Sequence, residues 1–513
     1  MSQKIQFQTT PEQAKDLVYL KVRIKKELNL KTDDFDFRWN RRSIDARKRD
    51  IKLNCSFEVF ETGEEIPALS SFYPKNVRNE KSIAIIGSGP AGLFAALRAL
   101  EVGLKPIVFE RGKDVRSRRR DLAKLNKEGI VNPESNYCFG EGGAGTYSDG
   151  KLYTRSKKRG DIQRALEWFV HFGATEDILV DAHPHIGTNK LPQIIVSMRE
   201  TIIEYGGEVR FESKVTDIIE EDGKVKSLVI NDSEIIDFDH VILATGHSAR
   251  DIIDIFVKKG WQLEAKAFAL GVRIEHPQNL IDKIQYSGRL NDEFLPPASY
   301  SLVTQVKDRG VYSFCMCPGG IIAPCATNQG EVVTNGWSPS KRNNPYSNSG
   351  IVVSISPDDF DDKSPLACLN FQKEVERRCW EEAGKDQKVP AQRLIDFMNG
   401  KVSEDFPQTS YQPGLKSVDL NKVLPPLITE SLKGAFTDFG NKLKGYLTNE
   451  AVLHAPESRT SSPVQIPRGD TLQHPQVIGL YPCAEGAGYA GGIISAAIDG
   501  MKCVDQIKLS IEN

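Results

Sequence analysis

The chain has 513 residues, of which 39% are hydrophobic and 27% charged, and its formal net charge is −2. This balance excludes a protein drawn as a whole to nucleic acid or to a membrane surface, and the length predicts two or three domains. No apolar run approaches the roughly 18 residues of a membrane span, and the first residues lack an apolar signal segment. The nine cysteines are scattered without metal-ligand spacing, so we expect reduced thiols, no metal site and a cytoplasmic location.

Residues 1–78 predict a small α/β domain. Residues 5–9 and 51–60 have the composition of strands, and a helix begins at Thr10-Pro11 and ends near Asn29. The segment 38–50 carries six basic residues against two acidic ones. Such a strip could bind RNA phosphates. We favour the alternative, a solvated edge or a docking surface for another domain, and we read residues 67–79 as a linker.

Residues 81–112 form the most informative stretch of the chain. An apolar strand over residues 82–86 leads into Gly87, Gly89 and Gly92 in GxGxxG spacing, and a helix, a strand at 105–109 and Glu110 follow. This order is the dinucleotide-binding fingerprint, in which glycines let a pyrophosphate approach the helix N-terminus. Glu110 lies 18 residues past Gly92, where an acid accepts hydrogen bonds from a ribose.

Two other segments match the same spacing, residues 140–145 and 486–491, but neither has the strand, helix, strand and acid in order. We therefore predict one dinucleotide-binding domain. The basic run 111–120 lies near it and could contact phosphate, with structural or solvated roles as the alternative. The glycine-rich segment 136–155 is either a close backbone approach to a flat ligand or a mobile loop.

Residues 191–205 predict a helix, and short strands follow at 208–211, 213–220, 225–231 and 234–238. A buried strand at 241–244 ends in Thr245-Gly246, a turn that meets the dinucleotide again. We interpret His247 as capping this turn and not as catalytic. From residue 261 to 450, short strands alternate with Pro/Gly turns, and helices follow at 365–383 and around 391–398, which predicts an antiparallel sheet with helices.

Three segments together resemble flavoproteins of the glutathione reductase superfamily: the fingerprint with its acid, the VILATG turn, and residues 477–500. The resemblance implies bound FAD. It places Glu485 at the acid that holds the ribityl or pyrophosphate part, where Asp is more usual. Gly491, Gly492 and Ile493 then begin a helix that points at the flavin ring. GEGGAGTYSDGKL, LATGHSARD, YSFCMCPGG, VTNGWS and ESRTSSPVQIPR are more closely similar to bacterial FAD-dependent, or NAD(FAD)-utilising, dehydrogenases.

We thus expect an α/β protein with a discontinuous Rossmann-like FAD-binding domain (79–260 and 451–513), an α+β cap domain (261–450) and the small N-terminal domain. The predicted cofactor-binding residues are Gly87, Ser88, Gly89, Pro90, Ala91, Gly92, Glu110, Arg111, Gly142, Gly143, Thr245, Gly246, Glu485, Gly491, Gly492 and Ile493. A helix N-terminus at Gly492-Ile493 would also stabilise negative charge on a reduced flavin.

The catalytic candidates are Ser148 and Lys151, in the glycine-rich loop, and Arg459, whose guanidinium suits an anionic substrate group. A solvated Lys151 and an ion pair of Arg459 with Glu457 or another acid are the alternatives. Cys315 and Cys317 could exchange electrons with a flavin, because residues i and i+2 of a strand share a face. We favour buried, inert thiols there.

These features predict a nucleotide-binding flavoprotein, an FAD-dependent oxidoreductase or dehydrogenase that transfers hydride or electrons between flavin and a small molecule. We expect NAD(P)H only as a transient donor, because a second fingerprint is missing. The alternative function is a flavoprotein that binds RNA or a protein partner through the basic N-terminal segment. We expect neither a membrane nor a nucleic-acid partner.

Overall fold

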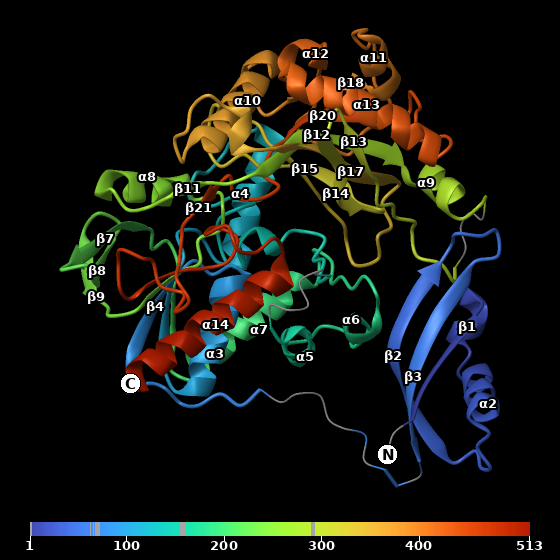
Figure 1. Cartoon of the computed structure of the whole chain (residues 1–513), viewed down its shortest axis with the longest axis horizontal. Coiled ribbons are helices and arrows are strands. Elements are labelled where there is room, and N and C mark those ends of the chain that lie inside the picture. Colours follow the sequence, from blue (N-terminus) through green and yellow to red (C-terminus); the bar gives the residue numbers. More distant parts are fainter. Residues whose placement is uncertain are drawn as a thin grey trace.

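The computed structural model of the chain describes residues 3–61, 63–64, 66, 72–153, 160–288 and 293–512. The first unit is a three-stranded antiparallel sheet with two helices on it (Figure 1). Its elements are β1 (Gln3–Thr9), α1 (Pro11–Lys15), α2 (Leu17–Leu28), β2 (Phe35–Asp45) and β3 (Lys52–Glu61), with strand order β1-β3-β2. The predicted linker at 67–79 lies partly outside the described residues.

Two details of this unit differ from the sequence-based expectation. The single predicted helix is two helices, because Asp16 is extended and its side chain accepts hydrogen bonds from the first turn of α2. The basic segment contributes to an unpredicted strand, β2. Phe37 and Trp39 alternate along β2 and pack on Phe57 of β3, with ring centroids 5.5 and 4.3 Å away. Cross-strand aromatic packing therefore outweighs the charged composition.

A five-stranded parallel sheet forms the second unit, in the order β22-β10-β4-β5-β6. Its strands are β4 (Ser82–Ile86), β5 (Lys105–Phe109), β6 (Glu208–Arg210), β10 (Val241–Leu243) and β22 (Leu480–Pro482). Near the chain end, α14 (Ile493–Glu512) packs beside α3 (Pro90–Val102) (Figure 1). A Cβ added to Gly500 would lie 2.1 Å from the Ala91 carbonyl oxygen, so this close helix contact requires glycine. The discontinuous Rossmann-like fold is confirmed.

Further helices and an antiparallel meander complete this part. They are α4 (Val115–Glu128), α5 (Ile162–His171), α6 (Asp177–Val180), α7 (Leu191–Glu204), α8 (Arg250–Lys259), β7 (Val215–Glu221), β8 (Lys224–Ile230) and β9 (Glu234–Asp237), with the short helix η1 (Gly143–Gly145) in the glycine-rich loop. The predicted helix and short strands are confirmed. Asp222 and Gly223 join β7 to β8 with φ values of 52° and 74°, as a tight hairpin requires.

The cap is a seven-stranded sheet in the order β13-β14-β17-β12-β20-β18-β19, antiparallel except for the pair β18–β19. Its strands are β12 (Phe268–Pro277), β13 (Val303–Val306), β14 (Arg309–Cys317), β17 (Tyr346–Ile355), β18 (Val389–Arg393), β19 (Leu415–Ser417) and β20 (Val452–Glu457). Its helices are α9 (Gln278–Gln285), η3 (Pro357–Asp359), α10 (Ala367–Ala383), α11 (Leu394–Asn399), α12 (Leu420–Val423) and α13 (Pro426–Lys442). Two separate two-stranded ribbons complete the fold, β15 (Ile321–Pro324) with β16 (Thr334–Trp337) and β11 (Glu264–Ala265) with β21 (Val464–Gln465).

The predicted antiparallel sheet with helices is thus confirmed, with two local differences. The predicted helix around 391–398 starts as a strand, because Ala391 pairs with His454 of β20. The long helix α13 has no counterpart in the sequence-based expectation. Because β20 pairs with β12 and β18, we propose that the cap domain extends to the end of β20, past the predicted boundary at residue 450.

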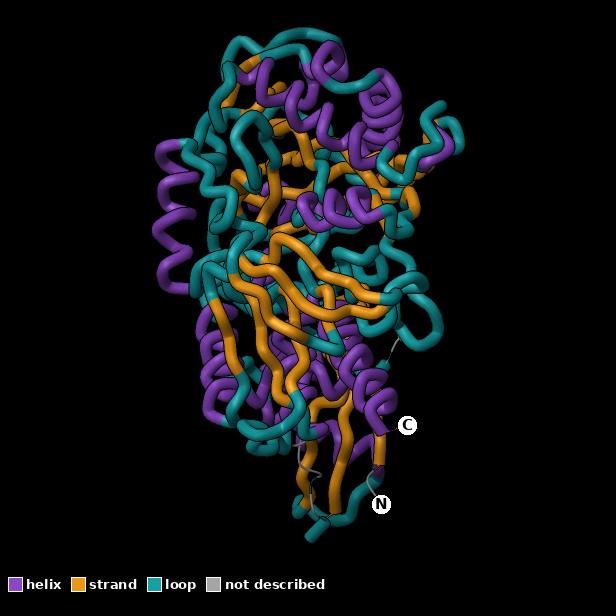
Figure 2. Tube along the Cα trace, turned by 90° about the vertical axis from the view of Figure 1, so that its left-hand side faces the viewer, coloured by secondary structure: helices purple, strands orange, loops and turns teal. Residues whose placement is uncertain are grey.

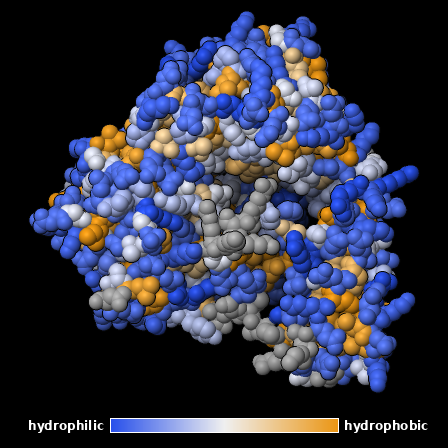
Figure 3. Space-filling model, viewed as in Figure 1, coloured by the Kyte–Doolittle hydropathy of each residue, from blue (hydrophilic) through white to orange (hydrophobic). Residues whose placement is uncertain are grey.

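Figures 1 and 2 place the cap helices α10–α13 at one end of the molecule and the C-terminal end of α14 toward the other. Within the described residues, we find no helix whose length and apolar character would let it cross a membrane. The face seen in Figure 3 is mainly hydrophilic, with an apolar patch over the N-terminal sheet and its helices at the lower right. Leu17, Val18 and Val22 of α2 are exposed apolar side chains of this unit.

Candidate functional site

One cavity lies between the carboxyl ends of the parallel strands and the cap sheet. Ligands of open α/β sheets bind at this place, where loops after neighbouring strands diverge. The cavity is lined by the turns after β4 and β10, the end of β5, the glycine-rich loop, the start of α14 and the cap strands β14, β16 and β20. The predicted residues that line it are Gly87, Gly89, Pro90, Ala91, Glu110, Arg111, Gly143, Ser148, Thr245, Gly246, Arg459, Glu485, Gly492 and Ile493. The other predicted residues, Ser88, Gly92, Gly142, Lys151 and Gly491, are not among the lining residues.

The fingerprint glycines have different tasks. Gly87 has φ +101°, and a Cβ on Gly92 would lie 1.9 Å from the Gly87 carbonyl oxygen, so both are required by the fold. At Gly89 the nearest atom to an added Cβ is the Gly143 Cα at 4.0 Å, so the space belongs to the cavity. Gly89 also caps α3 without a side-chain hydrogen bond. Since none of the described side chains caps this helix end and Gly89, Pro90 and Ala91 line the cavity, the first-turn N–H groups are left for a ligand, as an anion site requires.

Glu110 is used more fully by the protein than the sequence suggested. Oε2 accepts hydrogen bonds from the backbone N and Oγ of Ser88 at 3.0 and 2.7 Å, and Oε1 accepts from the N–H groups of Gly112 and Gly140 at 2.9 Å each. A carboxylate has about four acceptor positions. A ribose hydroxyl would thus have to replace one of these donors, most simply the Ser88 hydroxyl, so ribose binding by Glu110 stays a prediction.

The basic run after the fingerprint holds the glycine-rich loop in place. Arg118 is completely buried and donates to the carbonyl oxygens of Asn136, Tyr137 and Glu141 at 2.7 to 2.9 Å. Arg111 lines the cavity but is paired with Glu134 and Asp251. These contacts therefore favour a structural role for Arg118 over contact with a phosphate. The signal that sequence reasoning could have used is the position of Arg118 on the apolar side of an otherwise charged helix.

Glu485 lies at the acid position of the last segment, and its Oε1 is 3.6 Å from Nε2 of His247. Burial raises the pKa of Glu485 to about 7. Burial lowers the pKa of His247 to about 3, helped by the nearby Arg459 and Arg250 guanidinium groups. Near neutral pH the imidazole is therefore uncharged, and Glu485 is a mixture of neutral acid and carboxylate. No hydrogen bond of His247 to the turn after β10 is found among the described residues, so the capping role stays a prediction.

Arg459 lines the cap side of the cavity within a charge network. Its guanidinium pairs with Glu331 at 2.6 Å and with Glu376 at 3.1 Å, and Arg250 pairs with the same two acids at 3.1 and 2.7 Å. Burial would raise the pKa of Glu376, but Arg250 and Arg459 outweigh it and hold this pKa at about 2. The charges in this network cancel. Arg459 therefore forms ion pairs, as the alternative interpretation proposed, and its partners are Glu331 and Glu376 instead of Glu457.

Glu457 pairs with a residue that sequence reasoning missed. Arg273 of β12 is completely buried, and its Nε and Nη2 donate to Glu457 at 2.7 and 2.8 Å. Arg273 also donates to Asn348 at 2.7 Å and to the Cys315 carbonyl oxygen at 3.4 Å. A basic residue in the middle of an apolar strand was the signal, because such a charge must find a partner inside the protein.

Lys151 is not among the residues that line the cavity, and its side chain, although 35% exposed, is bound by other groups: Nζ donates to the Met316 carbonyl oxygen at 2.5 Å. Its Nζ lies 3.6 Å from Sγ of Cys315 and 3.6 Å from Sγ of Cys317, and 3.3 Å from Asp149. Cys315 lines the cavity, whereas Cys317 is buried. Ser148 lines the cavity and donates to the Gly145 carbonyl oxygen at 2.7 Å. The structure therefore brings together two predicted features, the loop lysine and the CxC pair.

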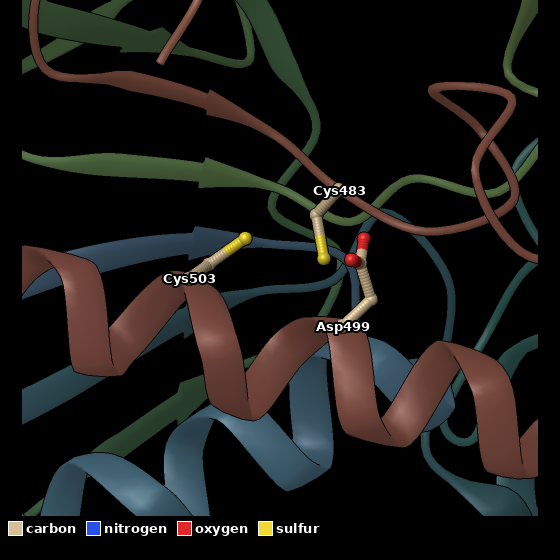
Figure 4. Close-up of side chains that lie close together, drawn as sticks. All are labelled: Cys483, Asp499 and Cys503. Carbon is tan, nitrogen blue, oxygen red and sulfur yellow. The ribbon is translucent and has the colours of Figure 1, made fainter. Parts of the chain in front are cut away.

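Figure 4 shows another pair of thiols, Cys483 and Cys503, with Asp499 beside them. Both Asp499 oxygens accept hydrogen bonds from Arg468, at 2.7 and 2.8 Å, and one also accepts from the Ala484 N–H. The carboxylate is thus already neutralised by a guanidinium. We interpret this cluster as a structural contact between β22 and α14 and not as a metal site.

The basic strip of β2 meets another part of the chain. Arg42 pairs with Asp181 at 2.5 Å and with Asp177 at 2.9 Å, and its carbonyl oxygen accepts from the Ala182 N–H at 3.0 Å. Arg38 pairs with Glu58 inside the N-terminal sheet. These contacts favour the docking alternative and leave less positive charge for RNA.

The comparisons with known proteins divide the chain in three. Residues 81–255 match the model of the pyridine nucleotide-disulphide oxidoreductases, and residues 267–460 match the C-terminal domain of FAD-dependent proteins. Residues 1–60 match a domain of unknown function.

A protein of Clostridium beijerinckii, recorded as uncharacterized, is 41% identical over 96% of both chains. A dual trans-enoyl reductase/FAD-dependent monooxygenase of Aspergillus terreus is 26% identical over 29% of this chain and 20% of its own. Among solved structures, CtdE in complex with FAD is 11% identical, with a TM-score of 0.33 over 84% of this chain and 85% of its own. L-proline dehydrogenase from P. horikoshii is 12% identical, with a TM-score of 0.33 over 85% of this chain and 95% of its own.

Proposed function

The chain belongs to a family of FAD-dependent oxidoreductases, and we propose that it oxidises or reduces an uncharged small molecule at the cap end of the cavity. One observation carries this proposal. A single cavity joins the open phosphate cradle at Gly89 to a cap wall whose charged side chains neutralise one another. We also propose that the fold belongs to the glutathione reductase superfamily.

The residues present fit FAD at several independent points. Gly89, Gly246, Gly491 and Gly492 have open space where a Cβ would stand, and the N-terminus of α3 offers unpaired N–H groups to a pyrophosphate. Segments from β4, β10 and β22 meet at one edge of the sheet. We propose that the first turn of α3 holds the pyrophosphate and that Glu485 and the start of α14 hold the ribityl and ring portions.

When bound, FAD supplies a two-electron redox centre. The start of α14 presents backbone N–H groups, whose partial positive charge favours negative charge close by. The neutral form of Glu485 can donate a hydrogen bond, which a carboxylate cannot. The cap strands β14, β16 and β20 cover the other side and limit the access of water.

The charged side chains of the cap wall pair with one another, and this neutrality favours an uncharged substrate. Arg459, the residue expected to bind an anionic group, shares Glu331 and Glu376 with Arg250, and Glu457 is neutralised by Arg273. Removing a carboxylate from water to meet a guanidinium that is already paired gains little. The remaining surface offers Phe314, Asn335 and Thr460.

Two measurements on the purified protein test this proposal. Acid precipitation should leave FAD in the supernatant, because the binding segments contain no recognised attachment motif. Anaerobic mixing of the oxidised holoprotein with candidate reductants should bleach the flavin for the true substrate. NADH and NADPH should reduce it slowly and without saturation at low concentration. Saturation at low micromolar NADH would contradict the transient role proposed for nicotinamide.

The charge of the substrate is tested with matched pairs, a carboxylic acid and its primary amide of the same carbon skeleton. We expect the amide to have the higher kcat/KM, by about tenfold or more, since an unpaired buried charge costs several kcal/mol. A tenfold preference for the acid would show that Arg459 is available to an anion and would overturn the proposed substrate class.

A further inference from the structure

The CxC pair of β14 differs from the other thiols of the chain in its surroundings. Cys315 faces the cavity and Cys317 lies buried behind it, and one ammonium group, Lys151 Nζ, is 3.6 Å from each sulfur. Lys151 reaches them from the glycine-rich loop, whose residues Gly145 and Ser148 line the same cavity. The thiols thus lie where the loop and the cap sheet meet.

The backbone at Cys315 is unusual. Cys315 has φ 46°, a left-handed conformation that few residues other than glycine adopt, inside a bulge that interrupts the pairing of β14 with β17 between Phe314 and Cys317. Cys317 donates to the Cys315 carbonyl oxygen at 3.2 Å, and Arg273 donates to the same oxygen at 3.4 Å. Bulges of this kind re-aim a side chain, and strained residues persist mainly at functional sites.

The charges around the pair favour one thiolate. On the loop side, Asp149 is shared by two cations, Lys151 at 3.3 Å and Arg342 at 2.8 Å. On the cap side, Arg273 and Glu457 neutralise each other. One positive charge is therefore left over among the described groups, and a thiolate at Cys315 would balance it.

The two sulfurs differ accordingly. When the Cys317 S–H turns from the Cys315 carbonyl oxygen to the Cys315 sulfur, this side-chain hydrogen bond, with Lys151 and Arg273 nearby, holds the pKa of Cys315 well below its usual range. The same hydrogen bond and burial raise the pKa of Cys317. By contrast, burial raises the pKa of Cys325, the neighbouring cavity thiol.

The pair lies at the ring end of the proposed FAD site. A Cβ on Gly145 would lie 3.4 Å from Pro90 and 3.7 Å from Ile493, so the loop passes between the starts of α3 and α14. Ser148 follows in the same loop and then Lys151, which contacts Cys315. Glu110 and Arg111 belong to the other end, beyond Gly89.

We propose that Cys315 and Cys317 are a redox-active dithiol that exchanges an electron pair with the bound flavin, with Lys151 as a positioning residue. This inference rests on the proposed function for the site of the flavin. In the step, the Cys315 thiolate and the Cys317 thiol join as a disulfide, and the S–H bond of Cys317 breaks. Two electrons and one proton leave the sulfurs, and both electrons and the proton are taken up by oxidised FAD. The reverse step reduces the disulfide.

The first test follows the sulfurs themselves. The holoprotein, with its thiols reduced and its flavin oxidised, is desalted and incubated with additional free FAD in the absence of oxygen. It is then alkylated and digested with trypsin. The peptide 310–341, which carries Cys315, Cys317 and Cys325, should be lighter by two hydrogen atoms and have one free thiol. This loss should persist in Cys325→Ala and vanish in Cys315→Ser and Cys317→Ser. Three free thiols in the wild-type peptide would overturn the proposal.

The second test follows the thiolate. The rate of Cys315 alkylation by iodoacetamide in the apo-protein should be half-maximal at a pH clearly below the ordinary cysteine value of about 8.5. Lys151→Met should raise this midpoint by about one unit or more, and Lys151→Arg should largely restore it. An unchanged midpoint in Lys151→Met would remove Lys151 from the proposal.

A reductive titration completes the design. Wild-type holoprotein should take up two electron pairs per flavin, and the two serine variants one pair, with Cys368→Ala, which removes a buried cap thiol, as the control. If the protein binds no FAD, the proposed function fails. The dithiol can then still be tested in the apo-protein, by incubating it with oxidised glutathione and measuring formation of the disulfide between Cys315 and Cys317. A protein that binds FAD but takes up one pair per flavin would overturn the dithiol alone.

Discussion

The two walls of the cavity are built in different ways. On the sheet side, the turn after β4 and the start of α14 present backbone N–H groups and glycines with open space above them. On the cap side, Arg459 and Arg273 are each held by carboxylates from other parts of the chain. One wall is a backbone cradle that depends on missing side chains. The other is a set of balanced charges, in which removing one member leaves another buried and unpaired.

This contrast predicts how each wall fails. A new side chain on the backbone wall should block the ligand and leave the fold intact. Loss of a charge on the cap wall should destabilise the fold first, because the remaining partner keeps its desolvation cost.

The largest effect is expected from Gly89→Val. A Cβ there meets no protein atom closer than 4.0 Å, so the branched side chain would occupy the space proposed for the pyrophosphate. We expect no retained flavin, with the free energy of unfolding of the apo-protein changed by no more than about 0.5 kcal/mol. Gly469→Val is the matched control, because Gly469 also has open space and lies outside the cavity lining. Normal flavin content in Gly89→Val would show that the pyrophosphate lies elsewhere.

Next in size is Arg273→Met on the cap wall. It leaves the completely buried Glu457 without its guanidinium, and we expect the free energy of unfolding to fall by about 3–5 kcal/mol in urea titrations. The double variant Arg273→Met/Glu457→Leu should recover most of this loss. Arg309→Met, which breaks a pair nearer the surface, should cost about 1 kcal/mol or less. Equal losses in both arginine variants would contradict the role assigned to burial.

Gly92→Ala should lower the free energy of unfolding of the apo-protein by about 1–3 kcal/mol or somewhat more. Its Cβ would lie 1.9 Å from the Gly87 carbonyl oxygen, so α3 must shift away from β4. Thermal unfolding of the apo-protein should show a lowered Tm, whereas Gly89→Ala should leave the Tm almost unchanged. Similar Tm values for the two alanine variants would indicate that both glycines serve the ligand alone.

The smallest effect concerns pH. The pKa of Glu485 is raised from 4.5 to about 7, so its proton stabilises the folded apo-protein below pH 4.5, and this stabilisation is lost as the pH rises to 7. The side chain is 31% exposed to the cavity, so we expect on the order of 1 kcal/mol. The difference between wild type and Glu485→Gln isolates this group from Glu275, whose pKa is also about 7. If the difference in the free energy of unfolding between the two proteins is the same at pH 4.5 and pH 7, the raised pKa of Glu485 is contradicted.

The backbone wall could be predicted from the sequence because its information is local. Gly87, Gly89 and Gly92 lie within one turn between a strand and a helix, so the positions that must lack a side chain can be recognised within six residues of the sequence. The cap sheet was predicted as a class for the same reason, from strands alternating with turns. The strand β2 was missed because its stability comes from Phe57 of β3, and not from its own charged composition.

By itself, then, the sequence determined the Rossmann-like fold and the FAD cofactor, and most of the site residues that it predicted line the cavity. Only the tertiary structure decided the partners of its charges. For Arg459 the sequence left open an anionic substrate group or an ion pair with Glu457 or another acid, and its partners Glu331 and Glu376 come from a distant loop and from α10. Lys151 meets Cys315 and Cys317 across 164 and 166 residues. Electrostatic pairing acts through space, and no local pattern reports which distant side chains the fold will bring within a few ångströms.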